Sequence, residues 1–294
     1  MRAALRLLLA TVVAAGSAGA AGRAAPQSPE ASDRPFLLTL RGEIATVNYT
    51  PGSLDRAVHV QRRLELLARD VGRWTGTPVR LRVFVLSREE WGKFGFLLPY
   101  GLPGRIGVDT LAVPAAGDSE TVRLWTDIRG APLEPLPGRP LKGTAVEAAS
   151  LALSDLLMEV EAARLLLALT GFEAEWPWLH QVTAHLLARA AFERYEEGRL
   201  PQIDELFARL GHGVAEPLPI ERYAPGLDLE TFLWFESRFY DGARHVMASG
   251  GKNEARSLLK RVRKASGTLS ETTFYELFPD LRDWRATAFA PAAG

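Results

Sequence analysis

Residues 153–162, LSDLLMEVEA, and residues 176–184, WPWLHQVTA, are the two stretches on which the interpretation of this chain depends. The first lies inside a run from about Val146 to Leu169 whose apolar residues recur at helical spacing. The second opens a run of the same character, from Trp178 to Glu197. We therefore expect two helices in succession, the first of which carries acidic side chains on an otherwise apolar surface.

The part of the chain that precedes these helices is rich in strand signals. Residues 36–49 alternate polar and apolar side chains as a hairpin of two short strands would, and residues 79–86, VRLRVFVL, alternate with period two. Between them, a helix is expected from Ser53 to about Trp74. Two more strands are expected, at residues 106–113 and 121–125.

The character of the sequence changes after residues 130–143, a proline-rich stretch without periodicity that predicts a loop. Further helices are expected at residues 229–247, at residues 253–264, and around Phe274 and Trp284. Strands in the first half and helices in the second predict an α+β fold. We expect one domain, built from a strand-rich lobe at residues 36–143 and a helical lobe at residues 144–290.

Composition narrows the range of partners and chemistry. Thirty-five basic residues balance thirty-five acidic ones, so no basic excess indicates a nucleic-acid partner. The chain has no cysteine, which excludes disulfides, thiolate metal ligands and a cysteine nucleophile. The apolar fraction of 47% is that of an ordinary globular protein.

The N-terminus has the pattern of an export signal. Arg2 and Arg6 precede a short apolar stretch, and small residues up to Ala20 offer a signal peptidase site. We expect a signal peptide at residues 1–20, a flexible leader at residues 21–35, and a mature protein that is secreted or periplasmic and does not span the membrane. An uncleaved membrane anchor is the alternative.

In content and order, the two quoted stretches resemble the active-site helices of gluzincin-type zinc metallopeptidases, the peptidase MA-like group. Members of this family carry HExxH on one helix and a WLxEGxA segment downstream. In the family, the two histidines and the downstream glutamate bind zinc, and the glutamate of HExxH is the general base. The resemblance extends over about residues 55–288 and implies a gluzincin-like fold, with a mixed sheet lobe followed by helices.

The sequence departs from the family pattern at every zinc ligand. Met158 and Ala162 stand at the two histidine positions, and Gln181 stands at the position of the ligand glutamate. Glu159 retains the general-base position, and Trp178 fits the downstream motif. A thioether, a methyl group and a neutral amide do not hold zinc in competition with water. The resemblance therefore implies that the metal is lost, and we expect no cofactor.

These positions predict a catalytically inactive, metallopeptidase-like protein that binds a peptide, a protein or an envelope component in the former substrate cleft. Candidates for lining that cleft are Glu159, Trp178 and His180. One alternative is an active hydrolase whose metal is held by Glu159, His180 and His185. Another is a structural or interaction protein without peptidase ancestry, in which Met158 and Ala162 belong to an ordinary buried helix. The oligomeric state is left open.

Overall fold

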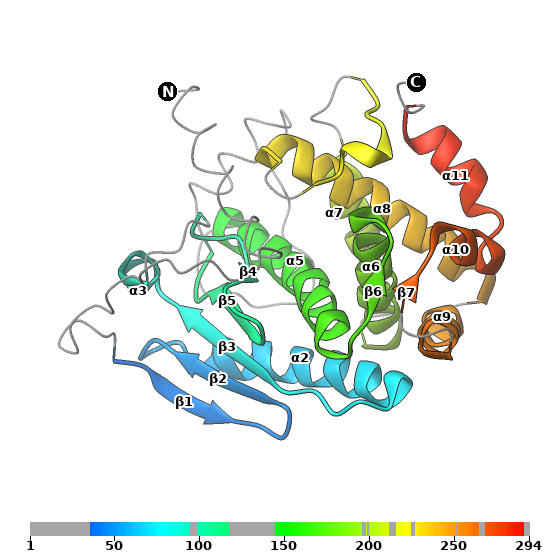
Figure 1. Cartoon of the computed structure of the whole chain (residues 1–294). Coiled ribbons are helices and arrows are strands. Elements are labelled where there is room, and N and C mark those ends of the chain that lie inside the picture. Colours follow the sequence, from blue (N-terminus) through cyan, green and yellow to red (C-terminus); the bar gives the residue numbers. More distant parts are fainter. Residues whose placement is uncertain are drawn as a thin grey trace, which may run out of the picture.

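The computed structural model describes residues 36–94, 99–117, 145–195, 198, 200–211, 216–224, 227–250, 252–264 and 268–290 (Figure 1). The expected signal peptide at residues 1–20 and the leader at residues 21–35 lie outside the described residues. So do the strand expected at residues 121–125 and the loop expected at residues 130–143.

A mixed five-stranded sheet forms the first part of the fold. Its strands are β1 (Leu38–Arg41), β2 (Ala45–Tyr49), β3 (Leu81–Leu86), β4 (Gly104–Arg105) and β5 (Thr110–Pro114). They lie in the order β1-β2-β3-β5-β4; the inner three are parallel, and each outer strand is antiparallel to its neighbour. The expected hairpin and the strand at residues 79–86 are confirmed. The strand expected at residues 106–113 begins later, and β4 was not predicted.

Two helices connect the parallel strands. Helix α2 (Leu54–Thr75) joins β2 to β3, as expected, and it ends at Gly76, whose φ of 69° is in the left-handed region. Helix α3 (Arg88–Lys93) follows β3, and its first turn is capped by the Ser87 hydroxyl, which accepts a hydrogen bond from the Glu90 amide at 3.2 Å.

Alternation along the strands separates two apolar layers. Val83 and Val85 of β3 belong to the main core, which also contains the buried face of α2. Leu86 and the partly buried Phe84 face the opposite side, where they pack with Trp91 of α3 in a smaller cluster. The period of two in residues 79–86 therefore reflects a sheet that is covered on both faces.

Helices make up most of the second part. They are α5 (Ala145–Leu169), α6 (Pro177–Tyr195), α7 (Leu200–Leu210), α8 (Leu229–Gly250), α9 (Lys252–Lys264), α10 (Glu271–Leu277) and α11 (Leu281–Ala288). Short strands β6 (Glu173–Ala174) and β7 (Thr268–Leu269) pair in parallel and tie the start of α6 to the start of α10. Helix α7 was not predicted from the sequence.

Helix α5 lies at the centre of the molecule, between the sheet with α2 and the remaining helices (Figure 1). One hydrophobic cluster continues from Ala45 of β2 to Phe289 after α11, so the two halves share a core. The fold is α+β, as expected from the order of strands and helices. Within the described residues, no helix is both long enough and apolar enough to cross a membrane.

The contact between α8 and α11 gives a test of this packing. A Cβ added at Gly242 of α8 would lie 2.6 Å from Cζ2 of the buried Trp284 in α11. Gly242→Ala should therefore displace α11 and lower the free energy of unfolding by about 1–3 kcal/mol. Urea unfolding followed by circular dichroism measures the change.

Gly92→Ala is the matched control, because a Cβ added at Gly92 in α3 would meet no other atom within 4 Å. This substitution should leave the stability unchanged or raise it by up to about 1 kcal/mol. Equal effects of the two substitutions would contradict the close approach of α8 and α11.

Candidate functional site

Helix α5 is enclosed around Met158, Glu159 and Ala162, since every residue from Leu153 to Ala163 is buried. It packs against α2 and against α6, and also contacts β4 and β5. Three acidic residues, Asp155, Glu159 and Glu161, lie within this stretch. A buried carboxylate is costly unless it is paired and hydrogen-bonded, so the surroundings of these three define the polar sites around α5.

Asp155 faces α2 and is held by two cationic or basic side chains. Arg56 forms an ion pair with one carboxylate oxygen, and Nε2 of His59 lies 3.2 Å from the other. Burial raises the pKa of Asp155, but Arg56, His59 and Arg63 together hold it well below its usual range. Arg56 also donates from Nε to the carbonyl of Pro114 at the end of β5, so it joins the sheet to α5.

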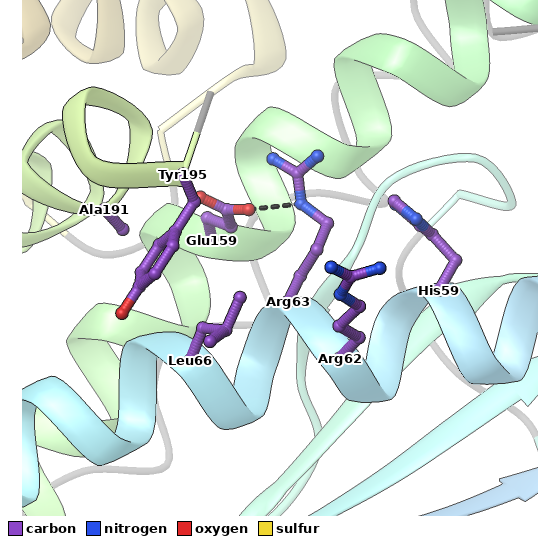
Figure 2. Close-up of a pocket in the computed structure, with 7 residues that line it drawn as sticks. All are labelled: His59, Arg62, Arg63, Leu66, Glu159, Ala191 and Tyr195. Carbon is purple, nitrogen blue, oxygen red and sulfur yellow. Dashed lines mark hydrogen bonds and ion pairs between the residues drawn. The ribbon is translucent and has the colours of Figure 1, made fainter. Parts of the chain in front are cut away.

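Glu159, one turn further along α5, also faces α2. Its carboxylate accepts a hydrogen bond from Nε of Arg63, and both side chains are buried (Figure 2). A pocket of about 240 Å³ opens beside this pair, between α2, α5 and α6. It is lined by His59, Arg62, Arg63, Leu66, Glu159, Ala191 and Tyr195.

A second polar group lies where α6 meets α8. The amide of Gln181 donates from Nε2 to both carboxylate oxygens of Glu236 in α8, at 2.8 and 3.1 Å. Nε2 of His185, one turn along α6, is 2.9 Å from the same carboxylate. All three side chains are buried. Among the described residues, Nδ1 of His185 has no hydrogen-bond partner, so Nε2 is the ring nitrogen that joins this group.

Glu161 extends this group toward α5. Arg164 donates from Nη2 to Glu161 at 2.6 Å. Burial raises the pKa of Glu161, and Arg164 offsets only part of that effect because Glu236 adds a nearby negative charge. Burial and Glu236 likewise raise the pKa of Tyr223 well above its usual value, although Tyr223 also shares a hydrogen bond with Arg164. We call Glu161, Arg164, Gln181, His185, Tyr223 and Glu236 the buried network.

His180 lies at the start of α6, beside this network. Its ring contacts Phe172 edge-on, with centroids 5.5 Å apart. Burial lowers the pKa of His180 to about 4, and the positive charges of Arg164 and of Arg105 on β4 add to the effect. The imidazole is therefore neutral near pH 7, and β4 lies close enough to α6 for Arg105 to influence it.

The residues at the family's motif positions are distributed between these groups. Met158 and Ala162 are fully buried in the core, and Gln181 is engaged with Glu236. Trp178, expected to line a cleft, is buried against Phe274 with ring centroids 5.9 Å apart. Of the three cleft candidates, Glu159 does line a pocket, but it does so on the side of α2.

The alternative ligand set of Glu159, His180 and His185 is not brought together. Glu159 pairs with Arg63 of α2, whereas His185 contacts Glu236 of α8. Across the described part of the chain, no group of three or more His, Cys, Asp or Glu side chains is placed to hold a metal ion.

Sequence reasoning missed the partners of these side chains. Glu236 is the residue that organises the buried network, and its signal was a single carboxylate among aromatic residues in the stretch FLWFESRFY. Arg63 lies one turn after His59 on α2, but nothing local indicated that it would reach Glu159, which is 96 residues away in the sequence.

No family model matches the chain, and no curated protein matches its sequence. The functional interpretation therefore depends on the motif positions in the sequence and on the geometry described above.

The pairing of Gln181 with Glu236 predicts the effect of restoring a carboxylate at position 181. Gln181→Glu removes the donor and places two carboxylates together in the core, so the free energy of unfolding should fall by about 2–4 kcal/mol at neutral pH. The new carboxyl would have a folded-state pKa above its unfolded value of about 4.3. The destabilisation should therefore grow as the pH rises from the unfolded-state pKa to above the folded-state pKa, and it should largely vanish in acid.

Gln181→Met is the control, because it removes the same donor at similar volume without adding charge. Gln181→Met should lower the free energy of unfolding by less than Gln181→Glu does at neutral pH. Its effect should change little with pH, because it adds no ionisable group. Urea unfolding of both variants from pH 4 to pH 8 makes the comparison. Equal stability of the two variants at neutral pH would contradict the pairing.

The low pKa of His180 is testable by NMR titration of the imidazole C–H signals. The midpoint of the titration should lie near pH 4. Because the unfolded-state pKa is near 6.5, stability should decline as the pH falls from about 6.5 to about 4. Arg105→Gln should raise the His180 pKa by removing a repulsive charge, and an unchanged pKa would contradict the closeness of β4 and α6.

Proposed function

We propose that this protein is a catalytically inactive member of the gluzincin-like metallopeptidases, and that it binds a peptide, protein or envelope component without cutting it. The observation that carries the proposal is the hydrogen bonding of the Gln181 side chain. This residue stands at the family's third ligand position, and its amide is committed to the buried carboxylate of Glu236. These bonds orient the amide through Nε2 and leave the position with only a neutral carbonyl oxygen, whereas zinc sites use imidazole, thiolate or carboxylate ligands.

The donor set does not fit a zinc ion. Met158 and Ala162 offer a thioether and a methyl group, both within the hydrophobic core. Structural and catalytic zinc sites use imidazole, thiolate and carboxylate ligands. The guanidinium of Arg164, paired with Glu161 in the same network, adds a positive charge that disfavours a second cation there.

Glu159 is also unsuited to the general-base role of the family. A general base needs hydrogen-bond reach to the proton that it removes. The Glu159 carboxylate is instead paired with Arg63 of α2 and lies in the α2–α5 interface. The ion pair with Arg63 gives a glutamate at this position a structural role that does not need catalysis.

The scaffold that would bind a ligand supports the proposal. β4 and β5 pack against α5, so this edge of the sheet lies beside the helix that carries Met158, Glu159 and Ala162. In the described residues β4 pairs with β5 alone, so its outer edge offers backbone groups to an extended peptide. Such a peptide would pass Arg105, and His180 lies close by. The N-terminal signal pattern favours a secreted or periplasmic setting.

The test uses the mature chain, from residue 21 onward, and a pool of peptides from a digested protein. Incubation with added zinc should leave every peptide mass unchanged by mass spectrometry, while an active zinc metallopeptidase run in parallel cleaves the pool. Immobilised protein should retain a subset of peptides intact. Arg105→Gln should reduce that retention, and Arg80→Gln, an exposed arginine before β3, should not.

Zinc-dependent cleavage that a chelator abolishes would overturn the proposal. Failure to retain any peptide would remove the peptide-binding part of it.

A further inference from the structure

The pocket between α2, α5 and α6 lies on the α2-facing side of α5 (Figure 2), whereas Gln181 and Glu236 of the buried network join α6 to α8. Its volume is about 240 Å³. Ligand pockets in proteins commonly measure about 300–1,000 Å³, so this pocket admits a small molecule and not a folded or extended chain.

One end of the pocket is basic. Arg62 and Arg63 follow His59 on α2 by three and four residues. All three side chains extend from the same side of the helix (Figure 2). Arg63 is paired with Glu159, and His59 is hydrogen-bonded to Asp155. Arg62 is exposed and forms no ion pair with any acidic side chain in the described ranges. The basic end therefore carries a positive charge that no acidic side chain among the described residues neutralises.

The other end of the pocket is apolar and held in place. Leu66, Ala191 and the ring of Tyr195 line it. The Tyr195 hydroxyl donates to Oδ2 of the buried Asp70 at 3.0 Å, and Asp70 also accepts a hydrogen bond from Arg194 at 2.5 Å. The hydrogen bond to Asp70 and the Arg194 guanidinium over its ring position Tyr195, which lines this end of the pocket.

We propose that this pocket binds a small organic monocarboxylate. Arg62 holds the carboxylate, since a guanidinium matches a carboxylate in two parallel hydrogen bonds, and a short apolar or aromatic body lies against Leu66, Ala191 and Tyr195. One uncompensated arginine fits one negative charge. The proposal is independent of the proposed function, because it uses none of the former zinc-ligand positions.

Phenylacetate is a suitable probe, and phenylacetamide is its neutral counterpart of nearly the same shape. Isothermal titration calorimetry and saturation-transfer NMR with the mature chain should show saturable binding of phenylacetate and at least tenfold weaker binding of phenylacetamide. Arg62→Gln should weaken phenylacetate binding at least tenfold. Arg69→Gln should leave it unchanged, because Arg69 is an exposed arginine on the same helix that pairs with Glu43 outside the pocket.

A second variant tests the location. Leu66→Trp fills the apolar end and should abolish binding while Arg62 remains in place. Unfolding curves matching those of the original chain show that loss of binding is not loss of fold. Equal binding of the acid and the amide, binding that survives both Arg62→Gln and Leu66→Trp, or no binding of phenylacetate at all would each overturn the proposal.

Discussion

Helix α5 has no side open to solvent between Leu153 and Ala163, and the arrangement of the other elements follows from this burial. Three carboxylates lie in the enclosed stretch, and each meets a basic partner: Asp155 meets Arg56, Glu159 meets Arg63, and Glu161 meets Arg164. Removing one member of a buried pair typically costs about 3–5 kcal/mol, because the other charge is left without compensation. The pairs to α2 therefore fix how the helix of the first half lies on the central helix of the second.

The same constraint applies where α6 meets α8. The buried carboxylate of Glu236 on α8 accepts hydrogen bonds from the amide of Gln181 and also contacts Nε2 of His185. Two residues one turn apart on α6 therefore satisfy a carboxylate that would otherwise be costly to bury.

Much of the fold could be predicted from local pattern, and the exceptions have physical reasons. The strand at residues 79–86 and the helix at residues 54–75 show clear periods of two and of 3.6. β4 was missed because it has two residues within a glycine-rich passage. β7 was missed for the same reason, since it consists of Thr268 and Leu269 just before Ser270, whose hydroxyl accepts from the Thr273 amide and caps α10.

The candidate site was predictable only in part. Helical spacing places Met158 and Ala162 on one face of α5, and both prove to be buried there. The partners of Glu159 and Gln181 come from α2 and α8, at sequence separations of 96 and 55 residues, where local periodicity carries no information. Trp178 was expected beside a cleft, but its ring packs in the core.

The metal content of the mature chain tests most directly whether the region around Met158, Ala162 and Gln181 binds zinc. The protein is dialysed first against buffer with added zinc, then against metal-free buffer, and analysed for elemental zinc per chain. Because the polar groups there are hydrogen-bonded within the protein, we expect zinc at the background level. One tightly held zinc per chain would contradict this account, because the residues around α5 would then have to provide a set of ligands that their present contacts do not allow.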